Sequence, residues 1–154
     1  MTPAIRALEA AGVPFTLHPY DHDPGVESFG EEAASVLGLD PDRVFKTLVV
    51  TADRGPAVAI VPVLRRLSLK AVAAALGGKR VEMCAPAEAQ RITGYVVGGI
   101  SPFGQRRRLP TVVDAACLSY DVVYVSGGRR GLDIGVAPHD LIRVLAAVAA
   151  PIAA

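Results

Sequence analysis

A single lysine, Lys46, lies within the apolar segment Val44-Phe45-Lys46-Thr47-Leu48-Val49-Val50. Burying an unpaired ammonium is expensive, so a lysine in an apolar strand needs either water or an anion beside it. Side chains alternate between the two faces of a strand, and the simplest interpretation is that Lys46 turns to solvent and has no role. A functional lysine is the second interpretation, and composition alone favours the first.

A glycine-rich segment covers residues 94–104 and reads Gly-Tyr-Val-Val-Gly-Gly-Ile-Ser-Pro-Phe-Gly. Glycine lets a backbone approach a ligand closely, and successive exposed N–H groups can bind a phosphate or a developing oxyanion. The segment is neither a Walker loop nor a dinucleotide-binding fingerprint, because its spacing differs from both. It is therefore either the wall of a ligand site or a tight turn at the corner of a sheet.

A second glycine turn, at residues 126–128, is followed by Arg129 and Arg130, and Asp133 then stands in an apolar strand. A carboxylate at that place could accept a hydrogen bond from a ligand amine or pair with a cation. The alternative is a plain hairpin whose arginines are solvated.

Neither a metal site nor a protein nucleophile is indicated. His18 and His22 have i,i+4 spacing, but the neighbouring prolines disfavour the helix that would bring both to one metal ion. Cys84 and Cys117 are expected to be small buried hydrophobes, since no histidine lies near either in the sequence. No serine has a G-x-S-x-G context. We therefore expect no metal, no cofactor and no nucleophile from the protein.

The length and composition suit one globular domain. The chain has 154 residues, of which 51% are hydrophobic, and residues 1–154 are expected to form a single domain whose core needs no disulfide. No apolar run reaches the ~20 residues that cross a bilayer, and the N-terminus lacks the pattern of a signal peptide. The two cysteines form no C-x-x-C pair, so a cytoplasmic location is expected.

The arginines are clustered, although the net charge is only +1. The clusters are Arg65-Arg66, Arg106-Arg107-Arg108 and Arg129-Arg130. One face could therefore be basic while the whole chain stays near neutral, which would suit a nucleic-acid partner. Solvated loops explain the clusters equally well.

Capping and turn signals divide the chain into short helices and strands. Helices are expected over 3–11, 31–37, 69–76, 86–92 and 138–149, and strands over 15–20, 44–51, 57–63, 81–84, 111–114, 122–125 and 132–136. Ser28 and Glu31 have capping-box spacing, and Asp53-Arg54-Gly55 marks a hairpin turn. Because the helices are short and the strands often adjacent, the pattern favours one mixed α/β domain over a regular βαβ array.

In combination, these segments resemble the YbaK family, also called the prolyl-tRNA synthetase-associated domain. The matching stretches are His18-Pro19-Tyr20, Phe29-Gly30-Glu31-Glu32-Ala33-Ala34 and residues 44–48, 98–104 and 126–138. The resemblance runs from about Thr2 to the last helix, and the ordered set is more specific than any one piece. It implies a single compact domain with a curved mixed sheet and short surrounding helices.

The resemblance also implies which residues are functional, and it reverses the interpretation of Lys46. In this family the lysine of the F-K-T motif is taken to hold the substrate through phosphate or carbonyl contacts. The other implied catalytic residues are Gly98, Gly99, Ser101 and Asp133, with Tyr20, Phe29, Thr47, Pro102 and Gly104 binding the substrate. The residues expected to bind tRNA are Arg106, Arg107, Arg108, Arg129 and Arg130.

Members of the family edit mischarged tRNA, and the pattern is closest to those that act on Cys-tRNA(Pro). We therefore expect a trans-editing deacylase that removes a wrong amino acid, first of all cysteine, from the tRNA 3′ end. The thiolate of a bound cysteine can attack its own activated ester and leave as a thiolactone, so the protein needs no nucleophile of its own.

Two alternatives stay open, and a set of partners is implied. The first alternative is a deacylase that uses water to remove another small amino acid such as alanine, and the second is a non-catalytic module that binds tRNA or nucleotides. The expected partners are aminoacyl-tRNA, in particular tRNA(Pro), and prolyl-tRNA synthetase. Neither DNA nor a membrane is expected as a partner.

Overall fold

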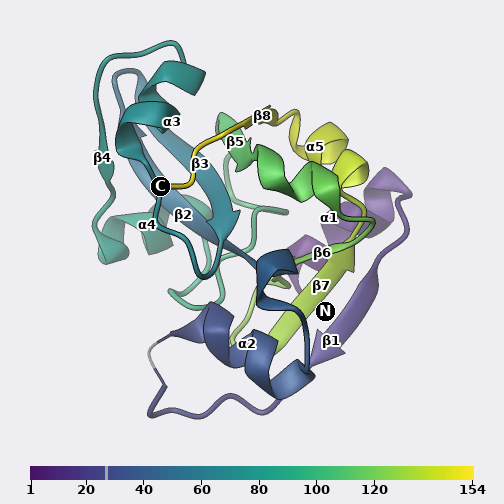
Figure 1. The fold of residues 1–154 in the computed structure, drawn as a ribbon. Coiled ribbons are helices and arrows are strands. Elements are labelled where there is room, and N and C mark those ends of the chain that lie inside the picture. The colour runs from purple at the N-terminus through teal and green to yellow at the C-terminus, as the bar shows by residue number, and fades with distance from the viewer. Residues whose placement is uncertain (27) are drawn as a thin grey trace.

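The computed structural model describes residues 1–26 and 28–154, in which short helices surround two sheets (Figure 1). The helices are α1 (Pro3–Ala11), α2 (Phe29–Leu37), α3 (Leu69–Ala75), α4 (Pro86–Thr93) and α5 (Pro138–Leu145), with short 3-10 helices at Pro41–Arg43 and Ala115–Ser119. The strands are β1 (Thr16–Pro19), β2 (Phe45–Ala52), β3 (Gly55–Pro62), β4 (Val81–Met83), β5 (Thr111–Asp114), β6 (Val123–Ser126), β7 (Leu132–Val136) and β8 (Val148–Ala150). The mixed α/β fold expected from the sequence is confirmed.

The strands are divided between two sheets, where the sequence led us to expect one curved sheet. The first has the order β4-β2-β3-β5-β8, in which β2 pairs antiparallel with β3 and β4 while β3–β5 and β5–β8 are parallel. The second is antiparallel, with the order β1-β7-β6. An isolated bridge between Val44 and Tyr124 joins them, so the start of β2 lies against β6.

The five-stranded sheet is covered on both faces, which explains why its central strands contain few polar residues. On one face, Val58 and Ile60 belong to a core shared with α1, α5 and the second sheet. On the other face, Ala57 and Ala59 pack with Val72 of α3. No helix in the described part of the chain is long and apolar enough to cross a membrane.

Two helices, α1 and α3, begin at a side-chain cap that the sequence indicates. Thr2 Oγ1 accepts a hydrogen bond from Ile5 N–H at 3.3 Å at the start of α1, and Ser68 Oγ does the same for Ala71 N–H at 3.1 Å in α3. Ser28 precedes α2, but its side chain makes no capping bond, so the capping box expected with Glu31 does not form. Helix α2 therefore begins two residues earlier than predicted, at Phe29.

The helix expected over 138–149 is wrong beyond Leu145. Ala146 takes the left-handed conformation with φ 50° and ends α5, and β8 then pairs in parallel with β5. Ile152 is completely buried, and Asp114 Oδ1 accepts hydrogen bonds from the N–H groups of Ile152 and Ala153 at 2.9 and 3.0 Å. Sheet pairing and burial of Ile152 thus override the helical preference of the alanine-rich end.

Candidate active site

A cavity of about 350 Å³ lies along β2, between the two sheets and the start of α2. Its walls come from β2, the start of α2, the β4–α4 junction, residues 97–100 and the strands β6 and β7. The sequence-predicted site residues on its wall are Tyr20, Phe29, Lys46, Thr47, Gly98 and Asp133. A volume of this size is typical of small-molecule sites.

The cavity follows a free edge of β2. Strand β4 pairs with β2 only at residues 50–52, and its last contact is the hydrogen bond from Cys84 N–H to the Val49 carbonyl at 3.1 Å. From Phe45 to Leu48 no described strand covers this side, so side chains from both faces of β2 reach the cavity. The free edge therefore explains how Lys46 and its neighbour Thr47 can border the same space despite pointing to opposite faces.

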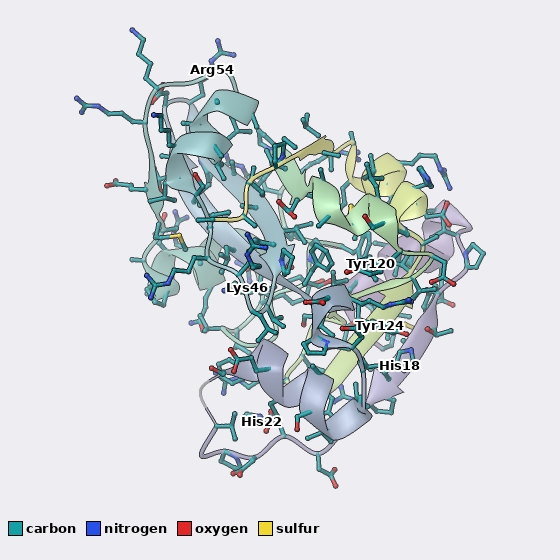
Figure 2. The ribbon with its side chains drawn as sticks, viewed as in Figure 1. His18, His22, Lys46, Arg54, Tyr120 and Tyr124 are labelled. Carbon is teal, nitrogen blue, oxygen red and sulfur yellow. The ribbon has the colours of Figure 1, made fainter. Side chains whose placement is uncertain are left out.

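Lys46 is half-buried on the cavity wall and lies between α2 and the hairpin tip marked by Arg54 (Figure 2). Its ammonium forms no ion pair within 4.0 Å with any described residue. Asp133 borders the same cavity but does not pair with it. Lys46 thus lies on the wall of a cavity at the strand edge, and its functional role stays a prediction. The ammonium remains free to bind an anion or a carbonyl oxygen.

Thr47 presents unpaired polar groups at the same edge. Its Oγ1 is the one buried side-chain oxygen or nitrogen among the described residues that has no hydrogen-bond partner. Thr47 faces Ile60 of β3, and the bonds from Val63 N–H to the Val44 carbonyl and from Cys84 N–H to the Val49 carbonyl fix the alternation along β2. By that alternation the Thr47 N–H and C=O point away from β3, toward the free edge.

Asp133 brings a carboxyl to the opposite wall. It lies in β7 between His18 of β1 and Ser126 of β6, and it is only 6% exposed. Burial raises its pKa to about 7. A buried carboxyl that titrates near neutrality and borders a cavity is a candidate for binding or proton transfer.

Tyr20 is held next to Asp133 by the backbone. Its N–H donates to the Gly131 carbonyl at 2.9 Å, which extends the β1–β7 pairing by one residue. Burial, and then the charge of Asp133, raises the pKa of the Tyr20 hydroxyl. The hydroxyl is therefore a hydrogen-bond donor near neutral pH.

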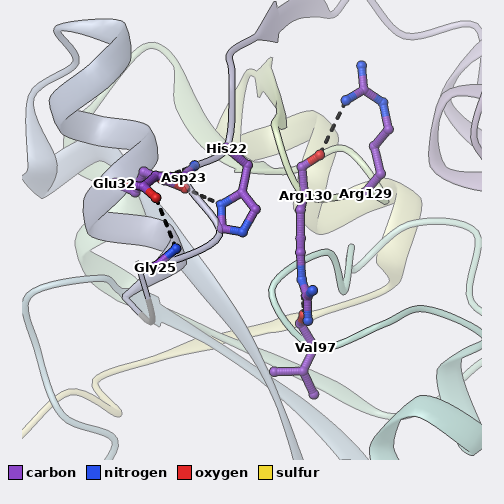
Figure 3. A network of polar contacts seen from close by, with 7 residues as sticks. All are labelled: His22, Asp23, Gly25, Glu32, Val97, Arg129 and Arg130. Carbon is purple, nitrogen blue, oxygen red and sulfur yellow. Dashed lines mark hydrogen bonds and ion pairs between the residues drawn. The ribbon is translucent and has the colours of Figure 1, made fainter.

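Phe29 is clamped between two side chains at the mouth of the cavity. The Arg130 guanidinium carbon lies 5.0 Å from its ring centroid, and the His22 ring centroid lies 5.4 Å from it. Figure 3 shows how each clamp is fixed: Arg130 Nε donates to the Val97 carbonyl at 2.8 Å, and His22 Nδ1 lies 2.6 Å from Glu32 Oε1. The contacts tie three segments together around one aromatic ring.

In the glycine-rich segment, the backbone lies close mainly to other parts of the protein. Gly98 borders the cavity with φ 89°, and a side chain there would collide with the Phe29 ring at 2.7 Å. A side chain at Gly99 would lie 2.8 Å from Arg129 Cα, and the Gly99 N–H already donates to the Val96 carbonyl at 2.8 Å. Gly98 therefore remains a candidate for the substrate wall, while Gly99 has no free N–H to offer.

Ser101, Pro102 and Gly104 are not brought to the cavity wall. Ser101 is fully buried, and its Oγ accepts a hydrogen bond from Phe103 N–H at 3.2 Å. Pro102 and Gly104 border a different hollow beside α1, where a side chain on Gly104 would lie 2.4 Å from the Pro3 carbonyl. These residues pack against α1, because the backbone at Gly104 lies next to Pro3 at the start of that helix.

The arginines expected to bind tRNA lie in two places. Arg129 and Arg130 lie in the connection between β6 and β7, close to the cavity, and both are exposed. Arg106 packs beside Gly94, and Arg108 donates to the Val144 carbonyl at 3.1 Å. Arg107 and Arg108 border the hollow beside α1 and also another hollow, at the far end of β2.

Sequence reasoning missed two features of the site. Cys84 was expected to be a small buried hydrophobe, but it is only half-buried and borders the cavity. The β4–α4 junction places it there, and no local motif marks it. The pair of His22 and Glu32 supports Phe29, and its ten-residue separation gave no signal. In residues 1–26 and 28–154 no group of three histidine, cysteine or acidic side chains could hold a metal ion.

Comparison with known proteins identifies the family of this chain. A small-molecule-sized cavity that offers one free ammonium and one buried carboxyl is typical of a ligand-binding site. The family model for the aminoacyl-tRNA editing domain matches residues 23–144. The chain belongs to this aminoacyl-tRNA editing family, and the resemblance to the YbaK family is confirmed.

Relatives are similar along nearly the whole chain. EbsC of Enterococcus faecalis, named as a candidate Cys-tRNA(Pro)/Cys-tRNA(Cys) deacylase, is 36% identical over 142 residues, which are 92% of this chain and 86% of that protein. ProXp-y of Escherichia coli, named as a multifunctional Ser/Thr-tRNA deacylase, is 23% identical over 141 residues, which are 91% of this chain and 84% of that one. The crystal structure of a candidate trans-editing enzyme for prolyl-tRNA synthetase is 25% identical, has a TM-score of 0.87 and covers 100% of this chain and 99% of its own.

Proposed function

We propose that this protein is a trans-editing deacylase that removes a wrongly attached amino acid, in particular cysteine from Cys-tRNA(Pro), at the tRNA 3′ end. The observation that carries the proposal is the cavity on the free edge of β2, where Lys46 and Asp133 border one space without pairing with each other. The names of EbsC and of the candidate trans-editing enzyme support the same substrate class.

Each free group in the cavity has a counterpart on an aminoacyl-adenosine. The Lys46 ammonium binds the phosphate or the ester carbonyl of the terminal nucleotide, since either is a strong acceptor for a cation. The ionised Asp133 carboxylate accepts a hydrogen bond from the substrate's α-ammonium. Phe29 and Gly98 form the wall beside the ester, and the Tyr20 hydroxyl donates a hydrogen bond to the bound substrate.

The chemistry then needs no protein nucleophile. The sulfur of the bound cysteine attacks its own carbonyl carbon, the carbon–oxygen bond to the ribose breaks, and the thiol proton ends on the ribose oxygen. The product is a thiolactone, and the cavity acts by holding sulfur and carbonyl carbon close together. Oxyanion donors come from the free N–H of Thr47 rather than from Gly99, because the Gly99 N–H is already used.

A second candidate is hydrolysis of other small aminoacyl groups by water. The likeness to ProXp-y, named for serine and threonine, favours it, because neither of those amino acids carries a thiol. The same cavity would then orient a water molecule with Asp133 as its base, which its pKa near 7 allows.

A panel of aminoacyl-tRNAs tests the proposal. Single-turnover deacylation is measured on tRNA(Pro) charged with cysteine, serine, alanine or proline, with and without the protein. We expect cysteine to be released fastest and proline to stay attached. Equal rates for cysteine and its oxygen analogue serine would exclude the thiolactone route and favour hydrolysis by water. If the protein accelerates deacylation of none of these substrates, it is a binding module and not a deacylase.

A further inference from the structure

A hollow of about 380 Å³ lies at the tip of the β2–β3 hairpin. Three segments that are distant in sequence meet there: the turn at Asp53 and Arg54, residues 76–79 after α3, and residues 107–110 before β5. Figure 2 places Arg54 at one extremity of the molecule, away from Lys46. The hollow is therefore separate from the cavity described above.

The rim of this hollow is strongly basic. Arg54, Lys79, Arg107 and Arg108 border it, all four are exposed, and none forms an ion pair within 4.0 Å with a described residue. The single acid on its wall is Asp53.

The charge of Asp53 is already used to hold the loop after α3. Its Oδ2 accepts a hydrogen bond from Lys79 N–H at 2.7 Å, and its Oδ1 accepts one from Arg80 N–H at 3.1 Å. Four cationic side chains are thus exposed around a concave surface, in a molecule whose net charge is only +1. One of them, Arg108, also donates a hydrogen bond to the Val144 carbonyl at 3.1 Å.

A concave cationic surface over an apolar floor attracts anions, because the low-dielectric wall focuses the field. Leu76, Val81 and Leu109 form part of this floor. Arginine binds phosphate through two parallel hydrogen bonds, and three of the four cations are arginines. The chemistry of the hollow therefore fits a sugar–phosphate backbone better than an isolated acidic side chain.

The distance from Lys46 indicates which part of an RNA would reach this hollow. Lys46 and Ala52, the last residue of β2 before the turn, are six residues apart (52 minus 46), which corresponds to about 20 Å along an extended strand at roughly 3.3 Å per residue. At roughly 3.4 Å per nucleotide, about 20 Å is the length of about six stacked nucleotides. This length exceeds the unpaired 3′ end of a tRNA and reaches into its acceptor stem.

We propose that the hollow bordered by Arg54, Lys79, Arg107 and Arg108 binds the phosphate backbone of the tRNA acceptor stem while the 3′ end occupies the cavity at Lys46. This proposal rests on the proposed function, since it takes an aminoacyl-tRNA as the substrate. It assigns Arg54 and Lys79, which no sequence motif marked, to substrate binding at a distance from the ester.

The double variant Arg54→Ala/Lys79→Ala tests this surface. Both side chains are exposed, and the loop is held through the backbone N–H of Lys79, so the fold should be preserved. The matched control is Arg65→Ala/Arg66→Ala, which removes the same charge from an arginine pair outside the hollow. Each is assayed on full-length aminoacyl-tRNA and on an aminoacylated trinucleotide that carries only the 3′ end.

We expect the double variant to lose about tenfold in kcat/KM on the full-length tRNA and nothing on the trinucleotide, because only the former reaches the hollow. The control should match the wild type on both substrates. Equal losses on both substrates, or none on the full-length tRNA, would overturn the proposal, and an equal loss in the control would show non-specific charge attraction instead.

Binding of uncharged tRNA separates this inference from the proposed function. The slope of log affinity against log salt should flatten by roughly 0.9 for each phosphate contact removed, so by roughly 2 in the double variant. This measurement needs no turnover. A wild-type protein that binds tRNA with the expected slope but deacylates nothing would contradict the proposed activity and leave the binding surface intact. Binding of an acidic peptide in preference to RNA would assign the hollow to a protein partner.

Discussion

Lys46 is the residue whose removal should affect catalysis most. Lys46→Ala deletes the free ammonium on the cavity wall, and the loss of one charge-assisted contact of ~2–3 kcal/mol corresponds to roughly a hundredfold in single-turnover rate. Lys46→Arg should also be impaired, because a planar fork does not replace a compact ammonium in a confined site. Thermal stability should stay equal or rise, since an incompletely solvated charge disappears.

Lys70→Ala is the matched control for this experiment. Lys70 is an exposed lysine of α3 that lies outside the cavity, so its removal changes the net charge equally and should leave the rate unchanged. A folded Lys46→Ala protein that deacylates at the wild-type rate would show that the ammonium contacts no substrate. The assignment of the cavity as the active site would then be wrong.

Asp133 should make stability depend on pH. Its pKa rises to about 7 in the folded protein from an ordinary value of 3.8, so folding costs free energy whenever the unfolded chain would be ionised. The penalty is absent below about pH 4, grows between pH 4 and 7, and is constant above; about three pKa units correspond to up to about 4 kcal/mol. Asp133→Asn should therefore be more stable than the wild type above pH 7 and equal to it near pH 4.

Urea denaturation between pH 4 and pH 8 measures this difference. Asp21→Asn, at an exposed position, is the control and should not show the same growing difference from the wild type. If Asp133→Asn follows the wild type at every pH, the carboxyl is solvated rather than buried. In deacylation assays the wild-type rate should rise through pH 7, as Asp133 ionises and can accept the substrate's ammonium.

At the scale of elements, the ring of Phe29 holds the start of α2 against two loops. Arg130 contacts that ring and also the Val97 carbonyl, so Arg130→Ala should loosen the cavity mouth. A loss of about tenfold in kcat/KM, or about 1.4 kcal/mol, is expected on both full-length tRNA and an aminoacylated trinucleotide. Arg129→Ala is the control and should weaken only the full-length substrate, because its guanidinium contacts the Arg130 carbonyl and not the wall.

The end of α5 carries backbone strain that a single substitution should relieve. Ala146 is the one described non-glycine residue with positive φ, at 50°. Because a β-carbon disfavours this conformation by roughly 1–2 kcal/mol, Ala146→Gly should raise stability by about 1 kcal/mol after its larger unfolded-state entropy is counted. Thermal melting should shift upward by roughly 2–4 °C. The same substitution in α1, Ala10→Gly, should lower the melting temperature, and equal shifts in both would contradict the strain.

The elements were more predictable from the sequence than the cavity. Gly12 and Thr2 delimit α1 through local chemistry, and the strand 132–136 is found with the expected ends. The alanine-rich end was mispredicted because pairing with β5 is a long-range effect. The free edge of β2 was invisible for the same reason: it depends on β4 stopping at Met83, and no residue near Lys46 encodes that.

At the scale of the whole molecule, basic surfaces coexist with a net charge of only +1. Affinity for tRNA should nevertheless fall steeply with salt, because counterion release depends on local phosphate contacts and not on total charge. Removing the Arg106, Arg107 and Arg108 cluster should weaken all tRNAs to a similar extent and flatten the salt slope. Filter binding at two or more salt concentrations measures the affinity and its salt slope. If the triple variant binds tRNA with normal affinity at low salt, the cluster is a solvated loop that contacts no phosphate.

The pairing of β1 with β7 has a consequence for how the active site comes into being. Thr16 pairs with Gly135 across 119 residues (135 minus 16), whereas β2 and β3 meet through a two-residue turn. Local hairpins form within microseconds, while closing a long loop adds an entropic barrier that delays non-local strands. Lys46 lies in the β2–β3 hairpin and Asp133 in the β6–β7 hairpin, so each belongs to a unit with a short connection. Tyr20, which follows β1, joins them on the cavity wall only through the long-range β1–β7 pairing. We therefore expect the wall at Tyr20 to be the last part of the cavity to form during folding.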